Sequence, residues 1–188
     1  MTETVLSCFG PGQYEKEGAI VGRLLAGYGE LEMEMTVCVG AAVKDLDDAI
    51  RAMFSVRGEE RRINLAKSNL RIPSTSAGLQ MLTKQILSDM EWCKAIRNQY
   101  AHCQWYPTRT SLGFVNLEEV ALIVGPLGLL EQYRHNLDHA LLLSQEEFFV
   151  YVRKCFWHLT ERFKNWAQVP ASQAFPLPSV IARPPKSI

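Results

Sequence analysis

Apolar residues recur at steps of three, four and seven along most of the chain, which is the spacing of one face of an α-helix. The pattern predicts one long helix from Tyr14 to about Val43 and another from Leu79 to Tyr100. A third long helix follows Ser144-x-x-Glu147, which is typical of a capping box at a helix start. Its seam of three- and four-residue steps from Phe149 to Trp166 is the clearest amphipathic signal in the chain.

Shorter elements connect the first two of these helices. A short helix capped by Asp45 or Asp47 is expected to stop at Gly58. The next, Glu59 to Leu70, should end before Pro73, because the residue that precedes a proline disfavours helical dihedrals. Residues Ser74 to Gly78 then form a loop.

The segment after the second long helix changes character. Trp105 to Leu117 predicts a small hairpin or extended flap. It belongs to an insert of about residues 104–124, in which Val120 to Val124 is also expected to be extended. Leu127 to Leu143 is interpreted as mostly helical.

We therefore expect an all-α fold, a helical bundle of about five helices with a small β-hairpin or extended insert. Residues 1–13 read as an irregular lead-in, 14–168 as one domain, and 169–188 as a flexible tail rich in proline. The chain has 188 residues, of which 47% are hydrophobic and 21% charged, which is typical of a globular domain.

The composition favours a cytoplasmic protein that inserts into no membrane. Five cysteines without a Cys-x-x-Cys pair argue against a disulfide framework. We expect neither a signal peptide nor an apolar run long enough to span a bilayer. Twenty basic residues balance twenty acidic ones, so any contact with RNA must come from a local basic surface.

The most informative chemistry lies at the end of the second long helix, in Arg97-Asn98-Gln99-Tyr100-Ala101-His102. Residues four apart on a helix share a face, which places Asn98 beside His102. Arginine supplies a planar fork for phosphate, and histidine exchanges a proton near neutral pH. The pair therefore suggests a site that acts on a phosphodiester, although His102 can also simply cap the helix end.

These six residues resemble the Arg-x4–6-His motif of the HEPN superfamily (higher eukaryote and prokaryote nucleotide-binding domains). The resemblance implies an all-helical domain that forms a homodimer, with the motif at the dimer cleft. It further implies a metal-independent endoribonuclease, needing no cofactor, in a toxin or phage-defence role. His102 would be the acid–base group, Arg97 the phosphate clamp, and Asn98 the residue that orients His102 or the substrate. RNA and an antitoxin or other protein would then be the partners, while some members of the superfamily are non-catalytic dimerisation or partner-binding modules.

Four further features have two interpretations each. Arg57 and Arg61, one helical turn apart, can bind phosphates or belong to a solvated face. Trp105 and Tyr106 can stack on an unpaired base or fill the space beneath the insert.

The other two features concern small residues and metal-binding types. A row of small residues on the first helix allows either a tight crossing within the chain or a homodimer contact; the row is Gly18, Gly22, Ala26 and Gly29. Two pairs of metal-ligand types permit zinc in principle, but they lack the compact loop that structural zinc favours, and we expect no metal; the pairs are His135 with His139 and Cys155 with His158.

Overall fold

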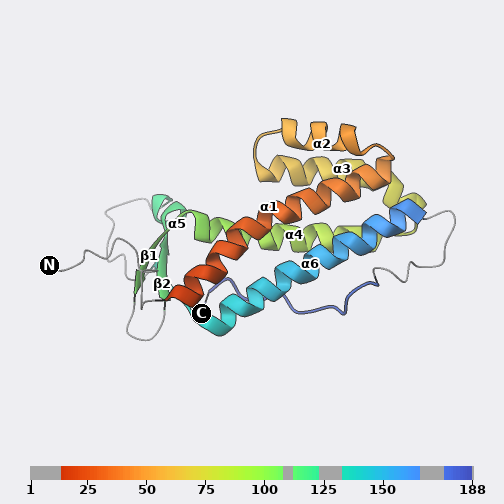
Figure 1. The fold of residues 1–188 in the computed structure, drawn as a ribbon. Coiled ribbons are helices and arrows are strands. Elements are labelled where there is room, and N and C mark those ends of the chain that lie inside the picture. Colours follow the sequence, from red (N-terminus) through yellow and green to blue (C-terminus); the bar gives the residue numbers. More distant parts are fainter. Residues whose placement is uncertain (1–13, 108–111, 123–132, 166–175, 188) are drawn as a thin grey trace. The chain divides into compact units, whose positions relative to one another are not determined.

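The computed structural model describes residues 14–107, 112–122, 133–165 and 176–187. Within them lie six helices and three strands (Figure 1). The helices are α1 (Glu15–Val43), α2 (Leu46–Ser55), α3 (Glu59–Ser76), α4 (Gln80–Ala101), α5 (Leu117–Ala121) and α6 (His139–Asn165). The strands are β1 (Cys103–Pro107), β2 (Leu112–Asn116) and β3 (Arg134–Leu137). This confirms the expected all-α fold with a small β insert.

The chain folds into two compact units, to which α1, α4 and α6 each contribute. The sheet unit consists of Met1–Ala26, Ala95–Glu147 and Arg183–Ile188, and the helical unit consists of Gly27–Lys94 and Phe148–Ala182. None of the described helices is long and apolar enough to cross a membrane.

The helical unit is built around a core of aliphatic, aromatic and sulfur-containing side chains. Its fully buried members include Leu31, Met35, Met53, Ile63, Leu70, Ile86, Met90, Phe156 and Leu159. They lie at the helical spacing that the sequence shows, so burial follows from the apolar stripes. The α1–α2 corner is tight: a Cβ on Gly40 would lie 2.9 Å from the Leu46 Cα, which leaves room for glycine alone. Asp45 caps α2, as expected, by accepting a bond from the Asp48 amide at 2.9 Å.

Helix α3 continues through Pro73 to Ser76, so the expected ending before the proline was wrong. Proline is tolerated best in the first turn of a helix, whereas Pro73 lies in the last turn of α3 and removes one amide donor from the helical ladder. The hydroxyls of Ser74 and Thr75 both donate to the carbonyl of Arg71, at 3.2 and 2.9 Å, and support this last turn. The predicted loop is therefore confined to the turn around Gly78, whose φ of +67° suits glycine.

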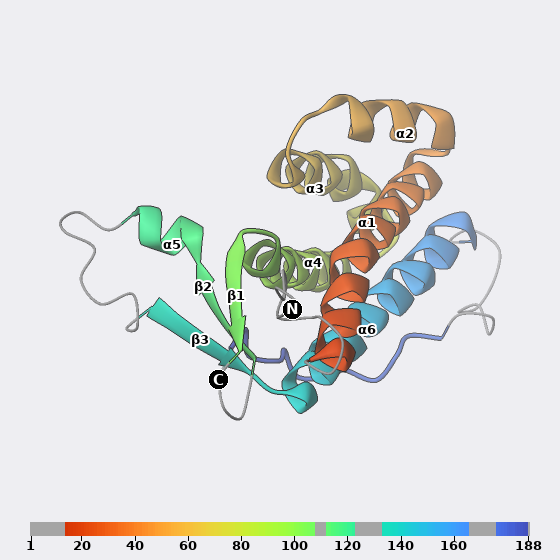
Figure 2. The same ribbon diagram turned by 60° about the vertical axis from the view of Figure 1, so that its left-hand side comes forward.

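The sheet unit contains an antiparallel sheet in the order β1-β2-β3, with β2 in the middle (Figure 2). The β1–β2 hairpin confirms the predicted flap, and Trp105 pairs with Phe114 across it. Two other expectations for the insert were wrong: residues 120–121 belong to α5 instead of being extended, and Arg134–Leu137 form a strand instead of a helix. Residues 123–132 lie outside the described part.

Strand β3 lacks the alternation of apolar and polar residues that would predict a strand, and its side-chain contacts explain why it forms. His135 stacks on Phe114 with centroids 5.0 Å apart, and the Arg134 guanidinium lies 4.8 Å above the Tyr106 ring. Such cross-strand contacts stabilise a pairing that local propensity does not favour.

Helix α6 begins at His139, so the capping box at Ser144 was wrong. Its first turn is capped by Asp138, whose carboxylate accepts a bond from the Leu141 amide at 2.7 Å. The Ser144 hydroxyl lies within the helix and donates back to the carbonyl of Leu141. The amphipathic seam predicted beyond it is confirmed as far as Phe163, because Val152, Phe156 and Phe163 are buried.

The described C-terminal residues, 176–187, contain neither helix nor strand. Their last part is held within the sheet unit, where Gln99 donates to the Lys186 carbonyl at 2.7 Å and Gln145 donates to that of Pro185 at 2.8 Å. The predicted lead-in and residues 166–175 of the predicted tail lie outside the described residues.

Small residues on α1 lie on an exposed face. A Cβ on Gly22 or on Gly29 would meet no described atom within 4 Å, and Ala26 between them is exposed. The tight intrachain crossing considered for this row was therefore wrong at these two glycines. A homodimer contact stays a prediction.

Candidate functional site

The end of α4 positions the three residues with the strongest chemical signal. Ile96 and Tyr100 are buried and anchor the last two turns of α4. Arg97 and Asn98 lie beside this buried face and are half-buried. His102 follows the last helical residue and is exposed.

The backbone of His102 is fixed on both sides. Its amide donates to the Asn98 carbonyl at 3.2 Å, which closes the final turn of α4. Its own carbonyl accepts a bond from the Leu117 amide, at 3.1 Å, where α5 begins. The backbone that carries the imidazole is thus held where α4, β1 and α5 meet, within the sheet unit.

The Arg97 guanidinium is oriented by its neighbour. Arg97 Nη1 donates to Asn98 Oδ1 at 2.8 Å. We had expected Asn98 to orient His102 or the substrate, and this contact gives it a role toward Arg97. A guanidinium held in one orientation retains less rotamer freedom, which lowers the entropic cost of binding an anion.

The two aromatic candidates lie in β1 and are both half-buried. Trp105 packs against Tyr100 and Phe114, with ring centroids 5.5 Å apart in each case. Tyr106 covers Gly113, where an added Cβ would lie 2.4 Å from the Tyr106 ring. These contacts favour the space-filling interpretation of both rings, and a stacking role toward a base stays a prediction.

Arg57 and Arg61 belong to the helical unit, whereas Arg97 and His102 belong to the sheet unit. Arg57 precedes α3 and Arg61 lies in its first turn, and both are exposed. Arg57 and Arg61 belong to a run of basic residues that continues with Arg62 and Lys67. These two later cations are paired: Arg62 Nη1 lies 2.7 Å from a Glu32 carboxylate oxygen, and Lys67 pairs with Glu91. The run is thus partly neutralised, and its phosphate-binding role stays a prediction.

Two of the three histidines among the possible zinc ligands, His135 and His139, have other partners. His135 Nε2 lies 2.9 Å from a Glu119 carboxylate oxygen and its Nδ1 lies 3.1 Å from the Ser187 hydroxyl. His139 Nδ1 lies 3.2 Å from a Glu17 carboxylate oxygen. Within the described ranges, no three His, Cys, Asp or Glu side chains form a group that could hold a metal ion.

Sequence reasoning missed the contacts of His135. Glu119, His135 and Ser187 lie far apart in sequence and at no regular spacing, so no local pattern could have predicted that they form one chain of hydrogen bonds. Their bonds link β3 to α5 and to the C-terminal residues inside the sheet unit.

Comparison with known proteins adds no relative. No protein-family model, curated protein or solved structure matches this chain significantly.

Proposed function

We propose that this protein is a metal-independent endoribonuclease of the HEPN type that works as a homodimer, in the toxin or phage-defence setting that the resemblance implies. The proposal rests on the exposed His102 imidazole, on a backbone fixed at both sides, together with the Arg97 guanidinium that Asn98 orients five residues before it. Both groups lie at the end of the same helix in the same unit.

The chemistry needs a base, an acid and a cation, which are the types of group that His102 and Arg97 provide. A base takes the proton from a ribose 2′-hydroxyl, and the resulting oxygen attacks the adjacent phosphorus. The bond from phosphorus to the 5′-oxygen breaks, and an acid protonates that leaving oxygen. The products are a 2′,3′-cyclic phosphate and a 5′-hydroxyl, and Arg97 stabilises the charge that develops on the phosphate oxygens.

One imidazole cannot act as base and acid on opposite sides of the phosphorus at the same moment. Two subunits related by a two-fold axis would supply two histidines and two arginines. This is the physical reason why the proposal includes a homodimer.

The test is cleavage of a fluorescent RNA in EDTA by the wild type and three variants. His102→Ala and Arg97→Ala are expected to lose at least 100-fold in rate, the usual range for losing an acid–base group or an oxyanion clamp. His139→Ala removes another exposed histidine and should leave the rate unchanged. Equal rates for His102→Ala and the wild type would refute the proposal.

A second candidate is a non-catalytic helical module for dimerisation or partner binding. The exposed row of Gly22, Ala26 and Gly29 favours it, because small residues let a partner helix approach closely. In that case Arg97 and His102 only fasten the end of α4. Alanine at either position would then lower the melting temperature without affecting any turnover.

Light scattering on a sizing column separates the outcomes. A dimer that cleaves RNA supports the nuclease, and a dimer that leaves RNA intact supports the module. A monomer at micromolar concentration contradicts the nuclease and the dimerisation module, and leaves only a module that binds another partner.

A further inference from the structure

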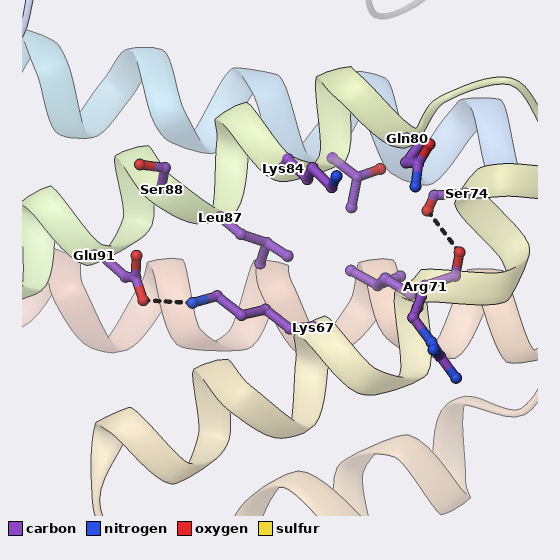
Figure 3. A pocket seen from close by; sticks show the side chains of 10 residues that line it. Lys67, Arg71, Ser74, Gln80, Lys84, Leu87, Ser88 and Glu91 are labelled. Carbon is purple, nitrogen blue, oxygen red and sulfur yellow. Dashed lines mark hydrogen bonds and ion pairs between the residues drawn. The ribbon is translucent and has the colours of Figure 1, made fainter.

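A pocket of about 290 Å³ opens between α3 and α4 within the helical unit (Figure 3). Its volume lies at the lower end of the roughly 300–1,000 Å³ common for small-molecule sites. Leu70 of α3 and Leu87 of α4, which are both buried, form its apolar wall. None of the residues proposed above for RNA cleavage lines it.

The same wall carries a polar group that lacks a partner. Thr83 is 4% exposed, and its hydroxyl makes no hydrogen bond to any described residue. Burying a hydroxyl without a partner costs free energy, so such groups in folded proteins are usually paired. The hydroxyl oxygen itself has almost no accessible surface, so the Thr83 side chain must turn to another χ1 rotamer for a ligand oxygen in the pocket to supply the missing acceptor.

The rim carries more positive than negative charge. Three cations and one carboxylate line it, and the carboxylate of Glu91 is already paired with Lys67 at 2.6 Å. Of the described carboxylates, none lies within ion-pair distance of Lys84 or Arg71. In Figure 3 Lys84 extends along α4 toward Gln80, while the Arg71 guanidinium points away from α4.

We propose that this pocket binds a small organic anion with an apolar body. Its carboxylate or phosphate group lies against the Lys84 ammonium, and the Thr83 hydroxyl donates to one of its oxygens. Its hydrocarbon part covers Leu70 and Leu87. The exposed Arg71 side chain, which has several rotatable bonds, turns inward to add a second cation to a phosphate. The site is independent of the nuclease proposal, because it uses other residues of another unit.

The test is a titration of the full chain with hexyl phosphate, hexanoate and hexanol, followed by ¹H–¹⁵N spectra. Hexyl phosphate or hexanoate is expected to shift the amide signals of residues around Leu70, Thr83 and Leu87 in a saturable way, and hexanol is expected to bind at least tenfold more weakly. The tighter of the two anions identifies the acidic group, and either result supports the site.

Three variants localise the binding. Lys84→Gln is expected to weaken it about tenfold, and Thr83→Val about fivefold, as for the loss of a charge-assisted and of a neutral hydrogen bond. Lys154→Gln, which removes an exposed lysine of α6, should leave it unchanged. Lys84 is itself exposed, so its replacement does not threaten folding. Shifts that never saturate, or equal affinity of Lys84→Gln and the wild type, would overturn the proposal.

Discussion

The buried side chain of Gln145 makes three hydrogen bonds within the sheet unit, and replacing it by leucine tests how this unit is held together. Its Oε1 accepts a bond from the buried Tyr100 hydroxyl at the end of α4. Its Nε2 donates to the carbonyls of Pro185, at 2.8 Å, and Lys186, at 3.2 Å. Gln145 itself is 0% exposed, so water cannot readily replace it.

The expected loss follows from these contacts. Leaving the Tyr100 hydroxyl without an acceptor costs ~1–3 kcal/mol, and each bond lost to a part-buried carbonyl costs ~0.5–1.5 kcal/mol. Some of this is recovered, because leucine buries more apolar surface. Gln145→Leu should therefore lower the free energy of unfolding by about 2–4 kcal/mol, which is a drop of about 5–15 °C in melting temperature for a chain of this size.

A double-mutant cycle separates the orphaned hydroxyl from the other losses. In the Gln145→Leu background, Tyr100→Phe removes that hydroxyl and should restore ~1 kcal/mol or more. In the wild type, Tyr100→Phe should instead be destabilising. Urea unfolding followed by circular dichroism measures all four proteins, and Gln104→Leu, at an exposed position, is the control. Simple additivity of the two changes would refute this account of the network.

Two further predictions concern the helical unit. Gly40→Ala should destabilise the protein by about 1–2 kcal/mol, because its Cβ would meet the Leu46 backbone. Gly29→Ala has open space around it and should stabilise the monomer by ~0.5–1 kcal/mol. Thermal melts of both variants check this, and equal effects would contradict the packing described. Burial raises the pKa of Cys38 to about 12 and that of Cys155 to about 11. Unfolded thiols ionise from about pH 8.5 while the folded ones keep their protons, so the free energy of unfolding should fall as pH rises from there toward 11. Urea midpoints at pH 7.5 and 10 measure this, and the fall should be smaller when both cysteines are replaced by alanine.

The long helices were predictable from sequence because their burial is periodic. A stripe such as that of α4 repeats over six turns, so single exceptions do not hide it. The β1–β2 hairpin was also visible, since Trp105 to Leu117 contrasts with the helices around it. Both signals are local, and local signals survive in a single sequence.

The errors arise where contacts that the sequence pattern does not show decided between local alternatives. Ser144-x-x-Glu147 has the form of a capping box, yet Asp138 caps the helix six residues earlier. Strand β3 is stabilised by contacts with the rings of Phe114 and Tyr106, and both rings lie too far from Arg134 in sequence to be part of a local pattern. Pro73 lies inside α3, where the hydroxyls of Ser74 and Thr75 bond back to the Arg71 carbonyl.

The candidate site was only partly predictable for the same reason. The Arg97–His102 spacing was readable, and the structure adds the Asn98 contact and the backbone bonds that hold His102. The pocket between α3 and α4 was not predictable, because the orphan hydroxyl of Thr83 appears only once the two helices are packed.

The nature of the RNA ends tests the central proposal most directly. Wild-type protein incubated with a single-stranded RNA in EDTA should yield fragments that end in 2′,3′-cyclic phosphate and begin with a 5′-hydroxyl, and a 2′-O-methyl group at the cleaved position should abolish the cut. Intact RNA, a requirement for divalent metal, or 5′-phosphate ends would contradict a site built from Arg97 and His102.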